Sequence, residues 1–255
     1  MYDIFIEAGQ SNAEGFGHGP SSDTYTPDHR ILYLNGSHPL AEDYDPSAPY
    51  VLEVADERPA PQLGTDDKLS DLSLTFARDY VDAGLLQPGR KLLIVRTAVG
   101  GTGFMFNQWE MDAPLYLRML SMTDHAMNLH PDCRLKGVIW HQGEHEAFEG
   151  NTPSRYHGQL LDLLNSVKAR YNCPKLPFIC GGFCDEWVQK FLVPCNAIMQ
   201  VLQDVAAEMG GAFIPTQDLL SNNQKTGDGD DIHFCRESLH ILGHRYFTAY
   251  QTIRK

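Results

Sequence analysis

Residues 2–12 read YDIFIEAGQSN, a short apolar segment that runs into the polar turn Gly9-Gln10-Ser11-Asn12. Similar apolar segments occupy 92–95, 135–140 and 176–180, and each is continuous rather than alternating in polarity. Continuous apolar strands are typical of a parallel sheet that is buried on both faces. The sequence therefore predicts an α/β fold in which helices cover both sides of a parallel sheet.

Stretches with the apolar spacing of helices separate these strands. Between the first strand and the first such helix lies a long segment, 15–68, rich in Pro, Asp, Ser and Gly, in which only 31–34 has the character of a strand. A loop of this length inside a compact domain is usually functional. We expect one domain over residues 1–255 with five main strands, a short strand at 212–214, and helices at 69–81, 114–128, 154–171, 197–209 and 237–253.

The bulk composition excludes several classes of protein. The chain has 255 residues with 20 Lys and Arg against 33 Asp and Glu, a formal net charge of −13. Non-specific nucleic-acid binding needs clustered positive charge, and the sequence has no basic run. No segment approaches the roughly 20 apolar residues that span a bilayer. Because residues 1–6 lack the features of a signal peptide, we expect a cytoplasmic protein unless such a peptide has been removed.

Three polar clusters lie at the ends of expected elements. Ser11 ends the first strand, Trp140-His141-Gln142-Gly143-Glu144 ends a later one, and Asp230-Asp231-Ile232-His233 precedes the last helix. The carboxyl ends of parallel strands assemble active sites from distant parts of the sequence. A serine, a histidine, an acid and amide donors together suit acyl transfer.

His233 is the best candidate for the base that a serine nucleophile needs. Asp230 lies three residues before it, close enough to hold Nδ1 and leave Nε2 facing Ser11. Asp231 is the adjacent alternative for the acid, and Glu144 is a further one. The non-catalytic alternatives are that Ser11 only caps a turn, and that the segment around Asp230 is an acidic surface turn that binds nothing or binds a calcium ion weakly.

Candidate donors to an oxyanion come from three places. Ser11 can offer its own N–H, and the glycine-rich exit Gly100-Gly101-Thr102-Gly103 lets backbone N–H groups approach a substrate closely. Gln142 can supply a neutral side-chain amide. For Glu144 we favour a structural anchor for the serine loop over a second acid partner or an exposed residue.

The letters His141-Gln142-Gly143-Glu144-His145 also match the H-x-x-E-H motif of zinc peptidases. That motif needs a continuous helix, so that the two histidines lie one turn apart on one face. Here the residues before it form an expected strand, and Gly143 interrupts a helix. We therefore do not favour a zinc hydrolase.

Taken together, these segments resemble the SGNH-hydrolase superfamily, in particular the branch of sialate O-acetylesterase-like domains and family 6 carbohydrate esterases, the acetyl xylan esterases. The resemblance implies a flavodoxin-like three-layer α/β/α fold and the removal of acetyl groups from carbohydrate without metal or cofactor. It implies Ser11 as nucleophile, His233 as base, Asp230 as orienting acid, and an oxyanion hole from Ser11, one glycine of Gly100-Gly101, and Gln142. The matching segments are Gly9-Gln10-Ser11-Asn12, Ala98-Val99-Gly100-Gly101-Thr102, Trp140-His141-Gln142-Gly143-Glu144, and Asp230-Asp231-Ile232-His233 followed by Leu242-Gly243.

The identity of the acetylated carbohydrate stays open. We expect selection by the 15–68 segment and by Phe104, Phe106 and Trp109, which could form a wall for stacking sugars. An anionic sugar would need an arginine, and Arg96 lies near a strand exit. The rival to an enzyme is a non-catalytic carbohydrate-binding module on the same fold, because fold does not fix function.

Overall fold

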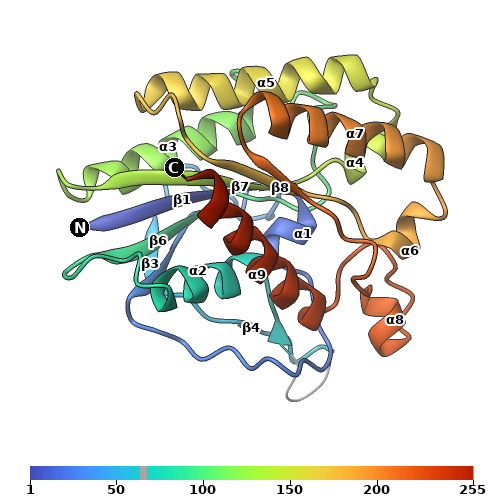
Figure 1. Cartoon of the computed structure of the whole chain (residues 1–255), viewed down its shortest axis with the longest axis horizontal. Helices are drawn as coiled ribbons and strands as arrows, with labels where there is room; N and C mark the ends of the chain where they lie inside the picture. Colours follow the sequence, from blue (N-terminus) through green and yellow to red (C-terminus); the bar gives the residue numbers. More distant parts are fainter. Residues whose placement is uncertain (64–67, 255) are drawn as a thin grey trace.

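The structure, a computed structural model, describes residues 1–63 and 68–254, and it is built on one large sheet between two layers of helices (Figure 1). Seven strands form the sheet in the order β3-β2-β6-β1-β7-β8-β9, rather than the five predicted. All neighbours pair in parallel except β3, which is antiparallel to β2 at the edge. The strands are β1 (Tyr2–Gly9), β2 (Ile31–Asn35), β3 (Val51–Val54), β6 (Lys91–Arg96), β7 (Arg134–His141), β8 (Phe178–Gly181) and β9 (Ala212–Ile214).

Side chains of the central strands enter two separate cores. In β1, Ile4 and Ile6 face one core and Phe5 faces the other, and all three are fully buried. Burial on both faces explains why the strands are apolar throughout, and it confirms the predicted three-layer arrangement. The helices of the first core are α3 (Pro114–Asn128), α5 (Pro153–Arg170) and α7 (Leu192–Glu208); those of the second are α2 (Leu72–Asp82) and α9 (Arg236–Ile253).

Further short elements lie at the carboxyl ends of the strands and in or next to the long 15–68 segment. Arg58–Pro59 (β4) and Lys68–Leu69 (β5) form a two-stranded ribbon apart from the main sheet. Short helices lie where chain segments leave or approach the sheet: α1 (Ser11–Glu14), α4 (Glu144–Glu149), α6 (Asp185–Val188) and α8 (Asn222–Thr226).

The carboxyl end of β1 is held tightly against β7. Gly9 pairs with His141 in parallel register, and the N–H of Gln10 donates to the carbonyl of His141 at 2.9 Å. Gly9 has a φ of 128°, and a Cβ there would overlap the backbone of His141. A glycine is therefore required at the point where the chain turns from β1 into α1.

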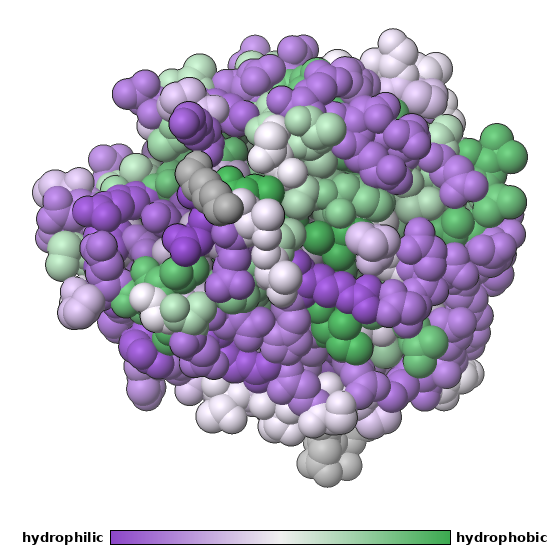
Figure 2. Space-filling view, viewed as in Figure 1, coloured by the Kyte–Doolittle hydropathy of each residue, from purple (hydrophilic) through white to green (hydrophobic). Residues whose placement is uncertain are grey.

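The face of the molecule seen in Figure 2 is mainly hydrophilic, with apolar residues in separated patches. Among the described residues, no helix combines the length and apolarity that crossing a membrane would need.

Candidate active site

The carboxyl edge of the sheet carries a cavity of about 490 Å³ in which the first and third predicted clusters meet. Ser11 at the start of α1 and His233 in the loop before α9 both line it. Gly101, from the loop after β6, and Glu144, from the start of α4, lie on the same wall. Ser11 and His233, which are 222 positions apart in the sequence, thus share one cavity.

Ser11 lies at the first position of α1 with 4% of its surface exposed. Among the described residues, no hydrogen bond uses its N–H or its Oγ, whereas its carbonyl accepts from the N–H of Gly15 at 2.9 Å. The helix start leaves backbone N–H groups without partners, and these favour negative charge. Both the hydroxyl and the N–H of Ser11 are therefore available to a ligand in the cavity.

His233 is oriented by Asp230. Its Nδ1 lies 2.8 Å from Asp230 Oδ2, and that oxygen also accepts from Asn222 Nδ2 at 2.9 Å. Burial raises the pKa of Asp230, but hydrogen bonds from His233 and Asn222 outweigh it, so the pKa lies below its usual value. The carboxylate therefore stays charged and holds Nδ1, while the ring of Phe16 stacks on the imidazole with 5.2 Å between centroids.

Asp231, the alternative acid, points elsewhere. Its carboxylate contacts the ammonium group of Lys190 rather than the imidazole of His233. Within the described chain, Ser11 Oγ and His233 are not hydrogen-bonded to each other, although they line the same cavity. Such bonds are often long before substrate binds and shorten in the complex.

Asn12 ties the serine loop to two other segments. Its Nδ2 donates to Glu144 Oε1 at 2.8 Å and to the carbonyl of Ile232 at 3.2 Å. Its Oδ1 accepts from the N–H of Phe234 at 3.0 Å. Glu144 is almost fully buried, and this burial raises its pKa. Because Asp230 occupies Nδ1 of His233, the contacts of Glu144 match the anchor rather than a second acid partner.

The backbone of the glycine loop offers one free donor on the cavity wall. The N–H of Gly100 donates to Glu14 Oε2 at 2.6 Å and is therefore occupied. Gly101 has a φ of 68°, and among the described residues its N–H has no partner. A Cβ on Gly100 would lie 3.4 Å from Cβ of Ser11, so this loop lies directly against the serine.

The predicted oxyanion role of Gln142 is contradicted by its contacts. Its Nε2 donates to Glu146 Oε1 at 2.9 Å, and its Oε1 accepts from Tyr156 Oη at 3.0 Å. The side chain is fully buried and does not reach the cavity. Gln10 lines the cavity instead: its Oε1 accepts from the N–H of His145 at 3.1 Å, which leaves its NH₂ group for a ligand.

The predicted aromatic wall is wrong for two of its three members. Phe104 and Trp109 are fully buried in the core below the loop, where the indole N–H of Trp109 donates to Thr102 Oγ1 at 3.0 Å. Phe106 is 68% exposed and forms a T-shaped pair with the ring of His145 rather than lining the cavity. The aromatic rings on the cavity wall are those of Phe16, Phe148 and Trp187.

The sequence signal for these rings was weak. Phe16 belongs to the 15–68 segment, from which His38 also reaches the cavity, in accord with a functional loop. Phe148 is exposed at the end of α4, and Trp187 lies in α6. Short helices after strand ends carry no periodic pattern that would mark them in the sequence.

The residues of the H-x-x-E-H pattern do not form a helical metal site. His141 ends β7, whereas Glu144 and His145 belong to α4, and Gly143 between them has a φ of 143°. Burial lowers the pKa of His141 to about 3, and its Nδ1 lies 3.0 Å from Tyr246 Oη. Among the described residues, the His, Asp, Glu and Cys atoms close enough to share an ion belong to His18, Asp228 and Asp230, not to this pattern.

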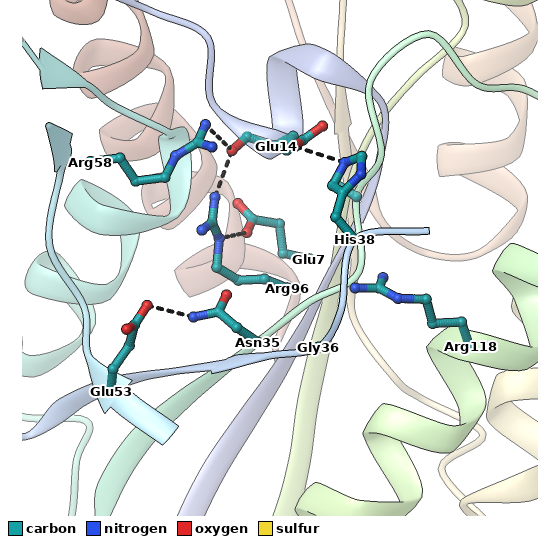
Figure 3. A pocket seen from close by; sticks show the side chains of 10 residues that line it. Glu7, Glu14, Asn35, Gly36, His38, Glu53, Arg58, Arg96 and Arg118 are labelled. Carbon is teal, nitrogen blue, oxygen red and sulfur yellow. Dashed lines mark hydrogen bonds and ion pairs between the residues drawn. The ribbon is translucent and has the colours of Figure 1, made fainter. Parts of the chain in front are cut away.

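Arg96 lies outside the catalytic cavity. Its guanidinium donates to the carbonyl of Glu14 at 2.6 Å and lies 4.6 Å from the ring centre of Tyr33. It lines a neighbouring cavity, shown in Figure 3.

Comparison with known proteins places the sequence in a family. The sequence profile of the family described as carbohydrate esterase, sialic acid-specific acetylesterase, matches residues 1–252. No curated protein matches the sequence. The structure is similar to that of NanS, with a TM-score of 0.78 at 20% identity over 98% of this chain and 97% of the other.

Two further solved structures share the fold. A protein from Arabidopsis thaliana has a TM-score of 0.71 at 19% identity, covering 98% of both chains. A carbohydrate acetylesterase from Xanthomonas citri has a TM-score of 0.62 at 18% identity, covering 99% of this chain and 56% of that one.

Proposed function

The chain belongs to the carbohydrate esterase family of sialic acid-specific acetylesterases and is a carbohydrate O-acetylesterase; from this premise we propose that Ser11, His233 and Asp230 carry its reaction. The observation that supports this assignment is the 2.8 Å contact between His233 Nδ1 and Asp230, at the rim of a cavity that also exposes Ser11. The contact leaves Nε2 of His233 free to act on the serine.

In the first half of the reaction, His233 Nε2 accepts the proton of Ser11 Oγ while Oγ attacks the acetyl carbonyl carbon. The oxyanion of the tetrahedral intermediate receives hydrogen bonds from the N–H groups of Ser11 and Gly101. His233 then gives its proton to the sugar oxygen as the carbon–oxygen bond of the ester breaks. The deacetylated sugar leaves, and Ser11 carries the acetyl group.

In the second half, His233 takes a proton from water as the water oxygen attacks the acetyl carbon. The same two N–H groups stabilise the second oxyanion. Collapse of this intermediate breaks the bond to Ser11 Oγ, which recovers a proton from His233 as acetic acid leaves and ionises. Asp230 stays ionised throughout and stabilises the imidazolium that forms in both halves.

The decisive test is Ser11→Ala, assayed by acetate release from a panel of O-acetylated sugars. We expect loss of nearly all turnover, because among the described residues Ser11 is the one that brings a hydroxyl to the cavity wall. Ser22→Ala is the matched control, since Ser22 is exposed and contacts Glu237 on the surface. A serine-directed fluorophosphonate should label the wild type and the control but not Ser11→Ala.

Two results would contradict the assignment. Substantial acetate release by a folded Ser11→Ala variant would remove Ser11 from the reaction. Loss of activity with a chelator, together with insensitivity to the fluorophosphonate, would point to a metal-dependent mechanism instead.

A further inference from the structure

The glycine loop, Gly100–Gly101, makes few contacts between its two ends. Before it, the N–H of Val99 donates to the end of β1 at 3.1 Å. After it, Thr102 is fully buried, and its Oγ1 donates to the carbonyl of Val99 at 2.6 Å. Within the part of the chain that the structure describes, the backbone groups of the two glycines make one hydrogen bond, from Gly100 N–H to Glu14 Oε2 at 2.6 Å. Because glycine is conformationally permissive, this bond is the contact that fixes the loop between its ends.

Glu14 is itself held in place by its neighbours. It is the last residue of α1, three positions after Ser11. Its carbonyl accepts from Arg96 at 2.6 Å and from Arg58 at 3.3 Å (Figure 3). Its second carboxylate oxygen, Oε1, lies 3.2 Å from Nε2 of His38. Both the backbone and the carboxylate of Glu14 are therefore fixed by the protein alone.

The imidazole of His38 supports the carboxylate as a donor. The N–H of Leu40 donates to Nδ1 of His38 at 3.3 Å, so Nδ1 is the acceptor of the ring. Nε2 then carries the hydrogen and donates to Glu14 Oε1. This contact leaves Oε2 directed at Gly100, and His38 thereby orients the carboxylate toward the glycine loop.

The bond also joins the glycine loop to the serine. A Cβ added to Gly100 would lie 3.2 Å from Glu14 Oε2 and 3.4 Å from Ser11 Cβ, so the three residues are in close contact. Ser11 and Glu14 both belong to α1, and Gly101 follows Gly100 on the cavity wall. The two N–H groups proposed for the oxyanion, those of Ser11 and Gly101, are therefore connected through Glu14.

We propose that Glu14 is a positioning residue for the oxyanion hole, which holds the N–H of Gly101 where the oxyanion forms. The inference rests on the proposed function and adds the residue that places one of its donors. A carboxylate only accepts hydrogen bonds, so Glu14 acts through the loop and not on the oxyanion itself. Because the oxyanion develops only in the transition state, the effect belongs to kcat rather than to KM.

The test compares Glu14→Ala with Glu14→Gln in the hydrolysis of 4-nitrophenyl acetate and of an O-acetylated sugar. We expect Glu14→Ala to lower kcat on both esters by about 10²-fold, because a misplaced donor no longer stabilises the oxyanion. KM should stay within about threefold of the wild type, since the lost interaction is made in the transition state. Glu14→Gln should keep kcat within about fivefold, because its amide oxygen still accepts from Gly100 through a neutral, weaker bond.

Glu14→Met is the second variant without a strong acceptor, and it keeps the length of the side chain. It should match Glu14→Ala in kcat, and it replaces that variant if alanine destabilises α1. Glu42→Ala is the matched control, because it removes a carboxylate that is exposed and makes no hydrogen bond or ion pair among the residues described. Its kcat and KM should equal those of the wild type.

Three kinetic results would overturn the proposal. Wild-type kcat in folded Glu14→Ala or Glu14→Met would show that the bond to Gly100 does not serve catalysis. An equal loss in Glu14→Gln would make the charge, rather than the acceptor, responsible. A loss confined to KM would mark a contact with the bound sugar.

Amide hydrogen exchange at Gly100, followed by NMR, tests the loop without any reaction. We expect exchange to be slow in the wild type and in Glu14→Gln, and about tenfold or more faster in Glu14→Ala. Unchanged exchange in Glu14→Ala would overturn the proposal whatever the rates are. If exchange responds as expected but Ser11→Ala still hydrolyses 4-nitrophenyl acetate, Glu14 holds the loop and it is the proposed function that fails.

Discussion

Two adjacent aspartates beside the proposed base make different contacts. Asp230 Oδ2 lies 2.8 Å from His233 Nδ1, whereas Asp231 contacts Lys190 at the surface. We expect Asp230→Asn to lower kcat by about 10²–10⁴-fold, because an amide favours the wrong tautomer and cannot stabilise the imidazolium. Asp231→Asn should stay within about threefold of the wild type, since surface ion pairs contribute little.

Acetate release measured for both variants under identical conditions checks this pair. Circular dichroism establishes that each variant is folded before its rate is interpreted. A larger loss in Asp231→Asn than in Asp230→Asn would move the orienting role to Asp231.

For single residues, the sequence predicted which residue types belong to the site better than it predicted where their side chains point. Ser11 could be proposed from its position after a strand, and Asp230 and His233 from their spacing of three residues, which suits a base and its orienting acid. Gln142 could not be assigned correctly, because its direction depends on Glu146 and Tyr156, which hold both ends of its amide. Its counterpart on the cavity wall, Gln10, is oriented by the N–H of His145 in another segment.

The short helix α1 is joined to two other segments by hydrogen bonds of the Asn12 side chain, one to Glu144 and two to the loop before α9. This side chain links the segments that carry Ser11 and His233. Asn12→Ala should lower the free energy of unfolding by about 2–4 kcal/mol, because it leaves buried polar groups without partners. It should also lower kcat by about tenfold or more, because small misplacements of reacting groups are costly.

Urea unfolding and acetate release measure the two effects of Asn12→Ala. Asn165→Ala is the matched control, since Asn165 lies exposed on α5 and makes no side-chain hydrogen bond within the described chain. Wild-type kcat in a destabilised Asn12→Ala variant would show that the connection serves stability alone.

Substitution of glycine by alanine should have opposite effects on the free energy of unfolding at two glycines in helices. A Cβ on Gly243 in α9 would overlap Thr75 Oγ1 and the carbonyl of Leu72 in α2, whereas a Cβ on Gly158 in α5 meets nothing within 4 Å. Gly158→Ala should raise the free energy of unfolding by about 0.5–1 kcal/mol through helix propensity. Gly243→Ala should lower it by about 1–3 kcal/mol, because the two helices must separate.

Thermal and urea unfolding of both variants, compared with the wild type, test this difference in sign. Stabilisation by Gly243→Ala would show that α2 and α9 are not in the close contact described.

The order of elements was predictable, and the errors have local causes. The helix expected at 114–128 is confirmed. The helix expected at 197–209 begins earlier, at Leu192. Pro194 does not interrupt it, because this proline lies in the first turn of the helix, where proline is tolerated. The helix expected at 69–81 begins at Leu72, because Asp71 caps it and Lys68–Leu69 pair with β4. β3 was missed because an exposed four-residue edge strand lacks a buried face and its pattern.

For the whole molecule, the buried charges around Arg96 link β1 and β6 to the start of α2. Arg96 lies between Glu7 of β1 and Asp71 at the start of α2, so one guanidinium faces two buried carboxyl groups. Tyr33 donates to Asp71 at 2.8 Å. Glu7 retains a proton at neutral pH, because burial and the nearby Asp71 raise its pKa to about 8.

This proton makes the stability of the molecule depend on pH in a definite direction. Burial and the proximity of Asp71 raise the pKa of Glu7 from 4.5 to about 8. Between these values the folded protein holds a proton that the unfolded chain has released, so the contribution of Glu7 to stability is lost as pH rises. The loss approaches about 1.4 kcal/mol per pH unit in that window and ceases above about pH 8.

Glu7→Gln removes this titration while keeping the shape of the side chain. Its free energy of unfolding relative to the wild type should therefore increase steadily from pH 5 to pH 8 and then level off. Urea unfolding at half-unit steps of pH measures the difference, and Glu149→Gln, on the exposed end of α4, should give a difference that does not change with pH. A wild type that gains stability over Glu7→Gln as pH rises would mean that Glu7 is ionised and paired with Arg96.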